Sequence, residues 1–401
     1  MAVPATAAVR RIPPVVPPQD AECVPADARA RAHGALAALT AATARHLGNP
    51  DLFHRPRVRT RLHLKHVGHA DPALLAERLA DAAESRTEAG LLAVASVRDE
   101  LRQRPGRRPC FTPDALAALH RMLVAGDPNI PGPGGLRRAP ARITWPDGRR
   151  FSIAVAPGRA LHGHVERWYR WAVRTASPAL DAAAFGMLRL FTVHPFPDGN
   201  GRTARLIAQC DLVGAGLLPG LLLDIGGWVD AHRAEHDEAV VAGADGEWER
   251  WGALFARAVT ETSRHRTATI TAYGALLDRA LDRVEDDPAA AEVLRLLRSG
   301  PAVSAQWLRG RIAHDPGPAL TRLRNAGILA PHPRLRDALV HPGLLNLLDA
   351  PYEGVDPLGR GRSDPGVRSA KEAAPDLPLT GADPHRRRCL ASGVRVRPDG
   401  R

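Results

Sequence analysis

The sequence predicts a mainly helical protein with one β-hairpin and a small C-terminal domain of short helices. Ala/Leu-rich stretches with apolar residues at helical spacing recur from residue 27 to residue 265. Two short β-prone runs, Ile143–Trp145 and Phe151–Val155, interrupt them. The chain has 401 residues, more than one compact core usually holds, so two or three domains are expected.

The N-terminal part begins with a Pro-rich lead over residues 1–20, which we expect to be extended and disordered. The next region, 21–110, is expected to be helical. Its first helix is predicted from Asp27, as the N-cap, to His46, before Asn49-Pro50. A second helix is expected over 72–84, continuing or restarting near Thr87.

The expected core covers residues 111–270. Its first helix starts after Thr112, which can cap Pro113 and the turn that follows, and its apolar face comprises Leu116, Leu119, Met122 and Leu123. Pro146-Asp147-Gly148 between the two β-prone runs predicts a hairpin. Further helices are expected over 164–175, 178–193, 203–214, 229–242 and 246–265.

After Asp287 the pattern changes to short elements. Helices are expected over 289–297, 304–312 and 318–326, with Gly327 ending the last one. Two apolar pairs, at 328–329 and 339–340, then flank an Arg-bearing turn. Three short helices and a small hairpin predict a winged helix-turn-helix domain over 285–350. The tail, 351–401, has almost no apolar periodicity and is expected to be disordered.

Composition limits the class of partner. The net charge of +12 suggests nucleic acid, but Lys65 and Lys371 are the only lysines among 55 basic residues. Arginine is spread along the whole chain with abundant Ala, Gly and Pro, which indicates a compositional bias more than a basic groove. The four cysteines form no CxxC pair, which favours a reducing compartment. We expect a cytoplasmic protein with no membrane partner, because apolar runs of signal-peptide or membrane-span type are lacking.

One segment carries residues suited to phosphate chemistry. Residues 194–205 read His-Pro-Phe-Pro-Asp-Gly-Asn-Gly-Arg-Thr-Ala-Arg, between two predicted helices. Gly199 and Gly201 let the backbone turn and expose successive N–H groups, which together with the helix dipole bind phosphate oxygens. Arg202 and Arg205 add positive charge and forked hydrogen bonds.

Three other side chains complete this segment. Asp198 offers a hard carboxylate oxygen suited to a Mg²⁺ ion that bridges phosphates. His194 titrates near neutrality and can take a proton from an attacking hydroxyl. Phe196 lies between polar residues and is best explained as an anchor of the loop in the core.

This segment resembles the Fic-domain motif HxFx(D/E)GNGRxxR and matches it at every specified position. The resemblance implies a Fic (Fido) helical bundle that transfers AMP from Mg²⁺-ATP to a Ser, Thr or Tyr hydroxyl of a target protein or of itself. It also implies a role for each motif residue: His194 as general base, Asp198 as Mg²⁺ ligand, Gly199, Asn200 and Gly201 as the anion-binding turn, Arg202 as a phosphate ligand, and Arg205 as the partner of the γ-phosphate.

The resemblance extends to the hairpin at 142–155, which falls where the family has its flap. It implies that Ile143, Thr144 and Trp145 position the target, by addition of a strand. Gly135-Leu136-Arg137, before the hairpin, resembles the usual entry into that flap.

The segment 84–90 resembles a degenerate copy of the family's inhibitory helix, (S/T)xxxE(G/N). Glu88 matches the inhibitory glutamate and Ser85 the second serine, whereas Glu84 replaces the first and Ala89 follows the glutamate. The resemblance implies that Glu88 pairs with Arg205 and displaces the γ-phosphate from its productive position.

Alternative readings stay open at this stage. A phosphoryl or other nucleotidyl transferase could use the same core, although Gly201 and Arg202 fit AMP transfer. A DNA-binding regulator could act through the winged helix, and such domains also dock proteins; the candidate DNA contacts are Arg309, Arg311, Arg322 and Arg324.

Two clusters favour ordinary structural roles. His63, His66 and His69 read as polar surface more than as a metal site, because supporting ligands are lacking nearby. Trp168, Tyr169 and Trp171 read as core anchors more than as a stacking platform.

Overall fold

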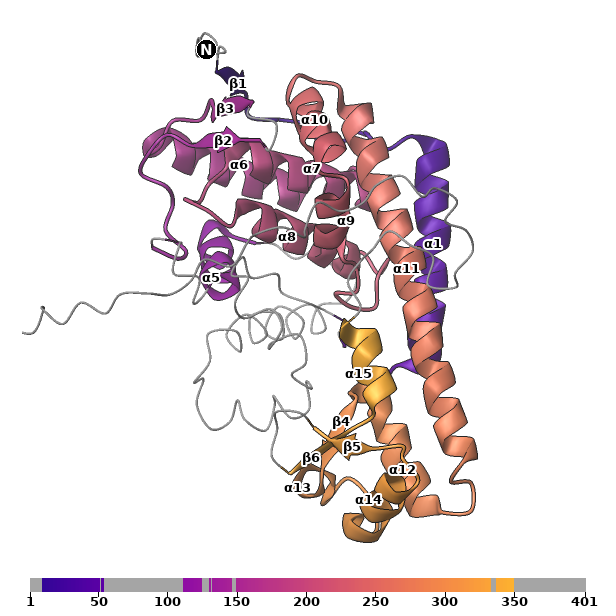
Figure 1. The fold of residues 1–401 in the computed structure, drawn as a ribbon. Coiled ribbons are helices and arrows are strands. Elements are labelled where there is room, and N and C mark those ends of the chain that lie inside the picture. Colours follow the sequence, from indigo (N-terminus) through magenta and orange to yellow (C-terminus); the bar gives the residue numbers. More distant parts are fainter. Residues whose placement is uncertain are drawn as a thin grey trace, which may run out of the picture. The chain divides into compact units, whose positions relative to one another are not determined.

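The computed structural model describes residues 9–50, 52–53, 111–124, 130, 132–145, 149–332 and 337–349. Within these ranges the chain is mainly helical and has two three-stranded sheets, which confirms the predicted fold class (Figure 1). The predictions for Ser85 and Glu88, for the three histidines at 63, 66 and 69, and for the tail lie outside the described residues.

Six helices surround the segment 194–205: α5 (Pro113–Leu123), α6 (Arg159–Arg174), α7 (Ala179–Val193), α8 (Asn200–Gly214), α9 (Ile225–Ala231) and α10 (Arg233–Ala244). Helix α7 is central, since 13 of its 15 residues are buried, and it packs against α6, α8 and α10 (Figure 1). The helix predicted over 229–242 is two helices, because the backbone of His232 leaves the helical region.

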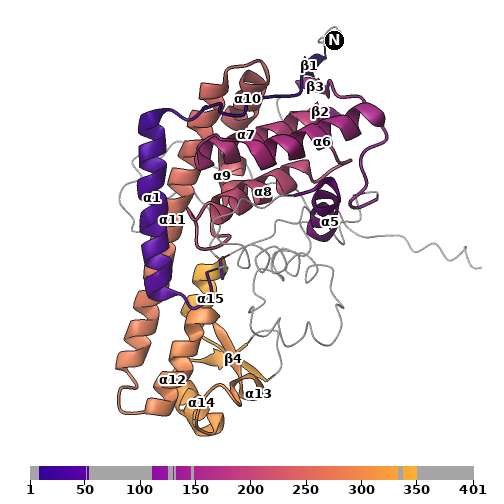
Figure 2. The same ribbon diagram turned by 180° about the vertical axis from the view of Figure 1, so that it is seen from behind.

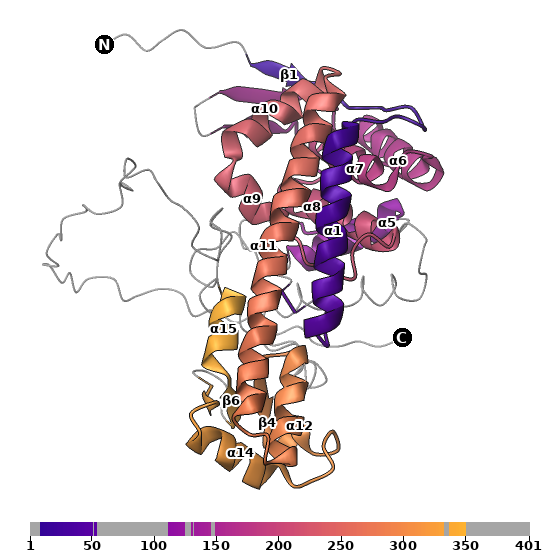
Figure 3. The same cartoon turned by 90° about the vertical axis from the view of Figure 1, so that its right-hand side faces the viewer.

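Two long helices support this group from one side. Helix α1 (Ala26–His46) and helix α11 (Trp248–Asp282) lie side by side (Figure 2 and Figure 3). Helix α11 extends beyond the predicted end at His265, because Ile270, Tyr273 and Leu277 continue its buried face. Gly274 allows the close approach of His46, whose ring fills the space that a Cβ would need.

The flap sheet contains the predicted hairpin and one unexpected strand. Strands β2 (Arg142–Thr144) and β3 (Arg150–Ile153) pair antiparallel, which confirms the hairpin. Strand β1 (Arg10–Ile12) pairs parallel with β3, so the strand order is β1-β3-β2. The prediction of a disordered lead is therefore wrong for residues 9–20, because Ile12 and Val15 are buried and β3 offers a free edge to this segment.

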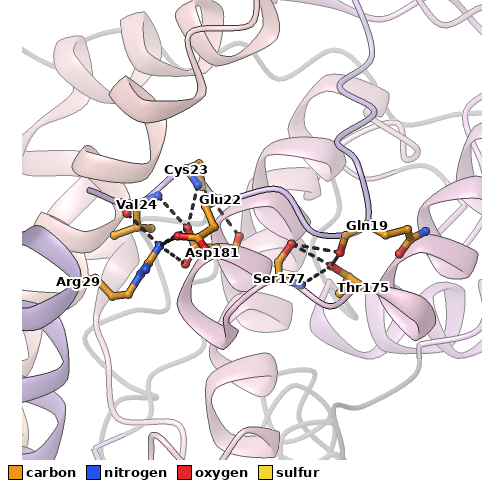
Figure 4. A network of polar contacts seen from close by, with 8 residues as sticks. All are labelled: Gln19, Glu22, Cys23, Val24, Arg29, Thr175, Ser177 and Asp181. Carbon is orange, nitrogen blue, oxygen red and sulfur yellow. Dashed lines mark hydrogen bonds and ion pairs between the residues drawn. The ribbon is translucent and has the colours of Figure 1, made fainter. Parts of the chain in front are cut away.

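A polar network ties the segment after β1 to the core (Figure 4). The carbonyl of Gln19 accepts hydrogen bonds at the turn between α6 and α7. Farther along, Asp181 Oδ1 accepts the backbone N–H groups of Cys23 and Val24, both at 2.8 Å. Arg29 of α1 lies 3.1 Å from Asp181 Oδ2, so one buried carboxylate of α7 fixes the start of α1.

The C-terminal part is made of short elements: α12 (Pro288–Leu296), η1 (Leu297–Ser299), β4 (Ala302–Ser304), α13 (Ala305–Leu308), α14 (Pro316–Asn325), β5 (Ala330–Pro331), β6 (Ala338–Val340) and α15 (Pro342–Asp349). Strand β6 pairs antiparallel with both β4 and β5. The predicted second helix is shortened to α13, because Gly310 has a φ of +82°. Strand β4 and helix α15 were not predicted, and the winged-helix assignment stays a prediction.

A search of the described helices for a membrane-crossing segment found none of sufficient length and apolarity.

Candidate active site

Residues 194–199 join α7 to α8, and residues 200–205 form the first turns of α8, which begins three residues before the predicted start at 203. Helix α7 ends at His194, whose backbone is left-handed with φ 50° and ψ 64°. Helix α8 begins at Asn200 after Gly199, which is also left-handed with φ 78°. A left-handed conformation is unusual for a residue other than glycine and often marks a functional position. The two bends bring the histidine and the N-terminus of α8 to the same short loop.

Asn200 closes this loop from within. Its Oδ1 accepts the backbone N–H of Phe196 at 2.9 Å, and its Nδ2 donates to the carbonyl of Phe196 at 2.8 Å. The ring of Phe196 is fully buried, in agreement with its predicted role as an anchor. Because both polar atoms of the Asn200 side chain are used in the loop, a phosphate would meet this residue through its backbone N–H.

The two glycines allow different close approaches. A Cβ at Gly199 would lie 2.8 Å from Val124 Cγ1 and 3.0 Å from His120 Nε2. A Cβ at Gly201 would lie 3.0 Å from Nη1 of Arg205, so this guanidinium lies over the first turn of α8. Gly199 is thus required by packing and by its φ, whereas Gly201 keeps the helix N-terminus open beside Arg205.

His194 is held in its neutral form. Burial lowers its pKa to about 4; Arg137 also lowers it, and the carbonyl of Phe191 opposes both. Nδ1 of His194 lies 3.4 Å from that carbonyl oxygen. This contact favours the tautomer with the proton on Nδ1, which leaves the lone pair on Nε2 to accept a proton. The ring is therefore a base at neutral pH.

Asp198 and the two motif arginines supply the charges of the site. Asp198 is half-buried, and its Oδ1 accepts the N–H of Gly199 at 2.6 Å. Arg202 and Arg205 are also half-buried, one turn apart on α8. Proteins usually hold Mg²⁺ with one or two carboxylates and complete its shell with phosphate oxygens and water. The carboxylate donor of Asp198 beside the N-terminus of α8 fits such an ion.

His120, which sequence reasoning did not single out, braces the loop from α5. It is fully buried and stacks on Phe196, with ring centroids 3.8 Å apart. Its Nδ1 accepts the N–H of Gly134 at 2.9 Å, so its Nε2 carries the proton and donates to the carbonyl of Asp198 at 2.9 Å. Its place on the apolar face with Leu116 and Leu123 was the signal that could have identified it.

Arg137 joins the loop to the flap. Its Nε donates to the carbonyl of His194 at 2.7 Å, and its backbone N–H donates to that of Pro195 at 2.9 Å. Its guanidinium also donates to the carbonyls of Ala139 and Val155, on either side of the hairpin. The sequence had marked this residue only as the entry into the flap. Buried at the joint, it couples the position of His194 to that of the hairpin.

The predicted flap residues divide into two groups. Ile143 is half-buried and Thr144 exposed on β2, one of the two edge strands of the described sheet. Trp145 is buried against Phe151, with ring centroids 4.1 Å apart, and the guanidinium of Arg149 lies over its ring. Only the first two are therefore placed to meet a target strand, and Trp145 anchors the hairpin.

Comparison with known proteins adds a family. Residues 110–211, which include α5, the flap hairpin and the whole segment 194–205, match the sequence model described as the Fic/DOC family.

Three solved structures are distantly similar. A Fic family protein from Desulfovibrio desulfuricans G20 is 14% identical with a TM-score of 0.41, over 78% of this chain and 95% of that chain. A Fic domain-containing signaling protein from Bacteroides thetaiotaomicron VPI-5482 is 16% identical with a TM-score of 0.41, and the match covers 62% of this chain and 96% of that chain. Fic-1 (residues 134–508) from C. elegans is 17% identical with a TM-score of 0.34, and the match covers 63% of this chain and 74% of that chain. The family assignment rests on the sequence match, because similarity at this level carries no argument of its own.

Proposed function

We propose that this chain transfers AMP from ATP to a hydroxyl side chain of a target protein or of itself. Its residues 110–211 match the Fic/DOC family model, and members of that family commonly transfer AMP or other nucleotide groups to proteins. The observation that carries the proposal is the neutral His194 at the entrance of a loop that ends in the N-terminus of α8. A base and an anion-binding turn on one loop are what attack on a phosphate requires.

The reaction proceeds as an in-line displacement. The hydroxyl oxygen of a Ser, Thr or Tyr residue forms a bond to the α-phosphorus while its proton passes to Nε2 of His194. The bond from the α-phosphorus to the bridging oxygen breaks, and pyrophosphate leaves. Arg202, Arg205 and the first N–H groups of α8 bind the phosphate oxygens and stabilise their charge. Mg²⁺, when bound by Asp198, supplies further positive charge at the phosphates.

The flap presents the hydroxyl. Strand β2 is an edge strand of the described sheet, with Thr144 exposed, so an extended target segment can pair with it. Arg137 binds both the hairpin and the carbonyl of His194, which keeps the distance between the presented segment and the base fixed.

Regulation by Glu88 is part of the proposal, and it rests on the sequence resemblance. A glutamate that pairs with Arg205 competes with the γ-phosphate for the same guanidinium. ATP then binds without its α-phosphate in line with the attacking hydroxyl.

The test is incubation of the full-length protein with ATP labelled at the α- or the γ-phosphate. We expect the α label alone to remain on protein, and mass spectrometry to find an AMP adduct on a hydroxyl residue. Retention of the γ label would instead indicate a phosphoryl transferase. His194→Ala should reduce incorporation about 100-fold or more, since positioned bases commonly contribute 10²–10⁴-fold.

A matched control is His162→Ala, which removes an exposed histidine of α6 and should leave incorporation unchanged. ATP binding by the His194→Ala variant should also be retained, because the phosphate donors are intact. Full transfer by this variant would exclude His194 as the base.

A further inference from the structure

Helices α6 and α7 enclose a group of hydrogen-bond donors that the proposed reaction does not use. Arg189 of α7 is 1% exposed, and in the described part of the chain its Nε and Nη1 have no hydrogen-bond partner. Trp168 of α6 is 2% exposed, and its indole Nε1 is likewise unpartnered among the described residues. Buried donors are nearly always paired in folded proteins, so such a group points to a missing acceptor.

These donors belong to one place. His164, Trp168 and Trp171 occupy positions i, i+4 and i+7 of α6 and therefore share one face of this helix. The residues at both ends of that face interact with Arg189. The guanidinium carbon of Arg189 lies 5.2 Å from the ring centroid of Trp171, and the charge of Arg189 lowers the pKa of His164. Trp168 lies between these two residues on the same face of α6.

The surroundings of Arg189 are positive. Burial and, to a smaller extent, the charge of Arg167 together lower the pKa of Arg189 to about 10. The pKa of His164 is lowered by burial, by Arg167 and by Arg189. The contact with Trp171 offsets only part of the cost of burying a guanidinium, so a negative group is needed to balance it.

We propose that Arg189 and Trp168 form a buried site for a small oxyanion, a carboxylate or a phosphate, between α6 and α7. A guanidinium presents parallel N–H groups that match two oxygens of such an anion, and the indole N–H adds a third donor. Arg167 is exposed and His164 is half-exposed, so the anion enters at their end of the α6 face.

The opposite end is closed by the N-terminal segment. Trp171 Nε1 donates to the carbonyl of Pro18 at 3.0 Å, and Thr192 accepts the N–H of Val15 at 3.1 Å. The hydroxyl of Thr192 in turn lies 3.3 Å from the carbonyl of Arg189. A bound anion therefore stabilises α6, α7 and this segment together. Because Arg189 precedes His194 by five residues, about 7.5 Å along the helix axis, this site is separate from the proposed reaction centre.

The experiment measures thermal unfolding of the full-length protein in sodium phosphate, sodium acetate and sodium chloride at equal ionic strength. It is done in an Arg205→Met background, which weakens phosphate binding at α8. We expect phosphate or acetate to raise the Tm by several degrees over chloride. Adding Arg189→Met should abolish this increase, whereas adding Arg170→Met, at an exposed arginine of α6, should preserve it.

A comparison of the Tm increase in phosphate with that in acetate shows which oxyanion the site prefers. An increase that is equal with and without Arg189→Met, or no increase with either anion, would overturn the proposal. Trp168→Phe, which keeps a ring but removes one donor, provides a second test if Arg189→Met does not fold. It should weaken anion binding several-fold in a calorimetric titration, and unchanged binding would also contradict the site. None of these outcomes depends on AMP transfer.

Discussion

His194 and His120 bind neighbouring parts of one loop but use their ring nitrogens in opposite ways. Burial lowers the pKa of each to about 4, so both are neutral at physiological pH. In His120 both nitrogens are engaged, one by Gly134 and the other by Asp198. In His194 the contact with Phe191 occupies Nδ1 and leaves the lone pair of Nε2 for chemistry. His120 thus braces the loop, whereas His194 keeps the lone pair that the proposed role as base requires.

The first prediction at this scale concerns pH. The deprotonated form of His194 accepts the proton in the proposed reaction. AMP transfer should therefore occur above the pKa of His194 and be lost as the pH falls through about 4. At saturating Mg²⁺-ATP, the initial rate of AMP incorporation should stay level from pH 8 to about 5.5. Circular dichroism at each pH restricts the profile to folded protein. A midpoint near 6.5, the ordinary histidine value, would contradict the burial of this base.

The second prediction concerns His120→Phe, which keeps the stack on Phe196 but removes both hydrogen bonds. The N–H of Gly134 and the carbonyl of Asp198 then lose their partner, which costs about 1–3 kcal/mol for each buried group. Chemical denaturation should therefore show a lower free energy of unfolding. His33→Phe, at an exposed position of α1, is the control and should leave the unfolding midpoint where it is. Equal midpoints in the two variants would exclude the bracing role.

At the scale of elements, local signals predicted the structure well. Helix α7 was expected over 178–193 and spans Ala179–Val193, because a proline precedes it and the motif loop ends it. Helix α5 starts after Thr112, whose Oγ1 accepts the N–H of Ala115 at 3.2 Å, as its capping role requires. The loop between α7 and α8 followed from its glycines and its flanking helices, although it ends at Gly199 and is shorter than predicted.

The structural features that the sequence did not predict depend on contacts between residues that are far apart in the sequence. Strand β1 has three residues with no periodicity of their own, and it forms because β3, about 140 residues later, offers an edge. His120 reaches Asp198 across 78 residues and Arg137 reaches His194 across 57. The apolar face of α5 could have marked His120 as buried, but no local pattern identifies the partner of either residue, so these two contacts required the structure.

The element-scale prediction concerns the attachment of α1. Asp181→Ala removes the acceptor of two backbone N–H groups and the partner of Arg29. Removing one side of a buried polar contact of this kind costs about 2–5 kcal/mol. The denaturant midpoint should fall accordingly. Asp27→Ala, which removes an exposed carboxylate of α1 and its solvent-exposed ion pair with Arg31, should lower it only slightly. An Asp181→Ala protein as stable as the Asp27→Ala control would show that α1 is held by its apolar face alone.

At the scale of the whole molecule, the net charge of +12 is not concentrated in the C-terminal part. Residues 285–350 contain eight arginines and seven acidic residues, so this part is close to neutral. Arg322 forms ion pairs with Asp286 and Asp287, and Arg311 stacks on Trp307. Arg309 and Arg324 are exposed, and they remain the candidates for the predicted nucleic-acid contact. This distribution fits a background of arginine better than a basic groove.

The last prediction joins the N-terminal region to the candidate active site. Arg205 lies over the first turn of α8, beside Gly201, where the resemblance places the γ-phosphate. A carboxylate that forms a bidentate pair with this guanidinium competes with the nucleotide for it. Glu88→Gly should therefore raise incorporation of α-labelled AMP into the protein about 10-fold or more, a change that corresponds to about 1.4 kcal/mol of lost competition.

Two variants separate this mechanism from a loss of charge in the N-terminal region. Glu84→Gly removes a carboxylate four residues earlier and should leave self-modification at the wild-type level. Adding Arg205→Ala to Glu88→Gly should cancel the gain, because the freed guanidinium is what orients the triphosphate. If the gain survived without Arg205, Glu88 would act elsewhere, for example by holding the target segment away from β2. Equal activation by Glu84→Gly and Glu88→Gly would show that a general loosening of this region, and not competition for one arginine, controls the enzyme.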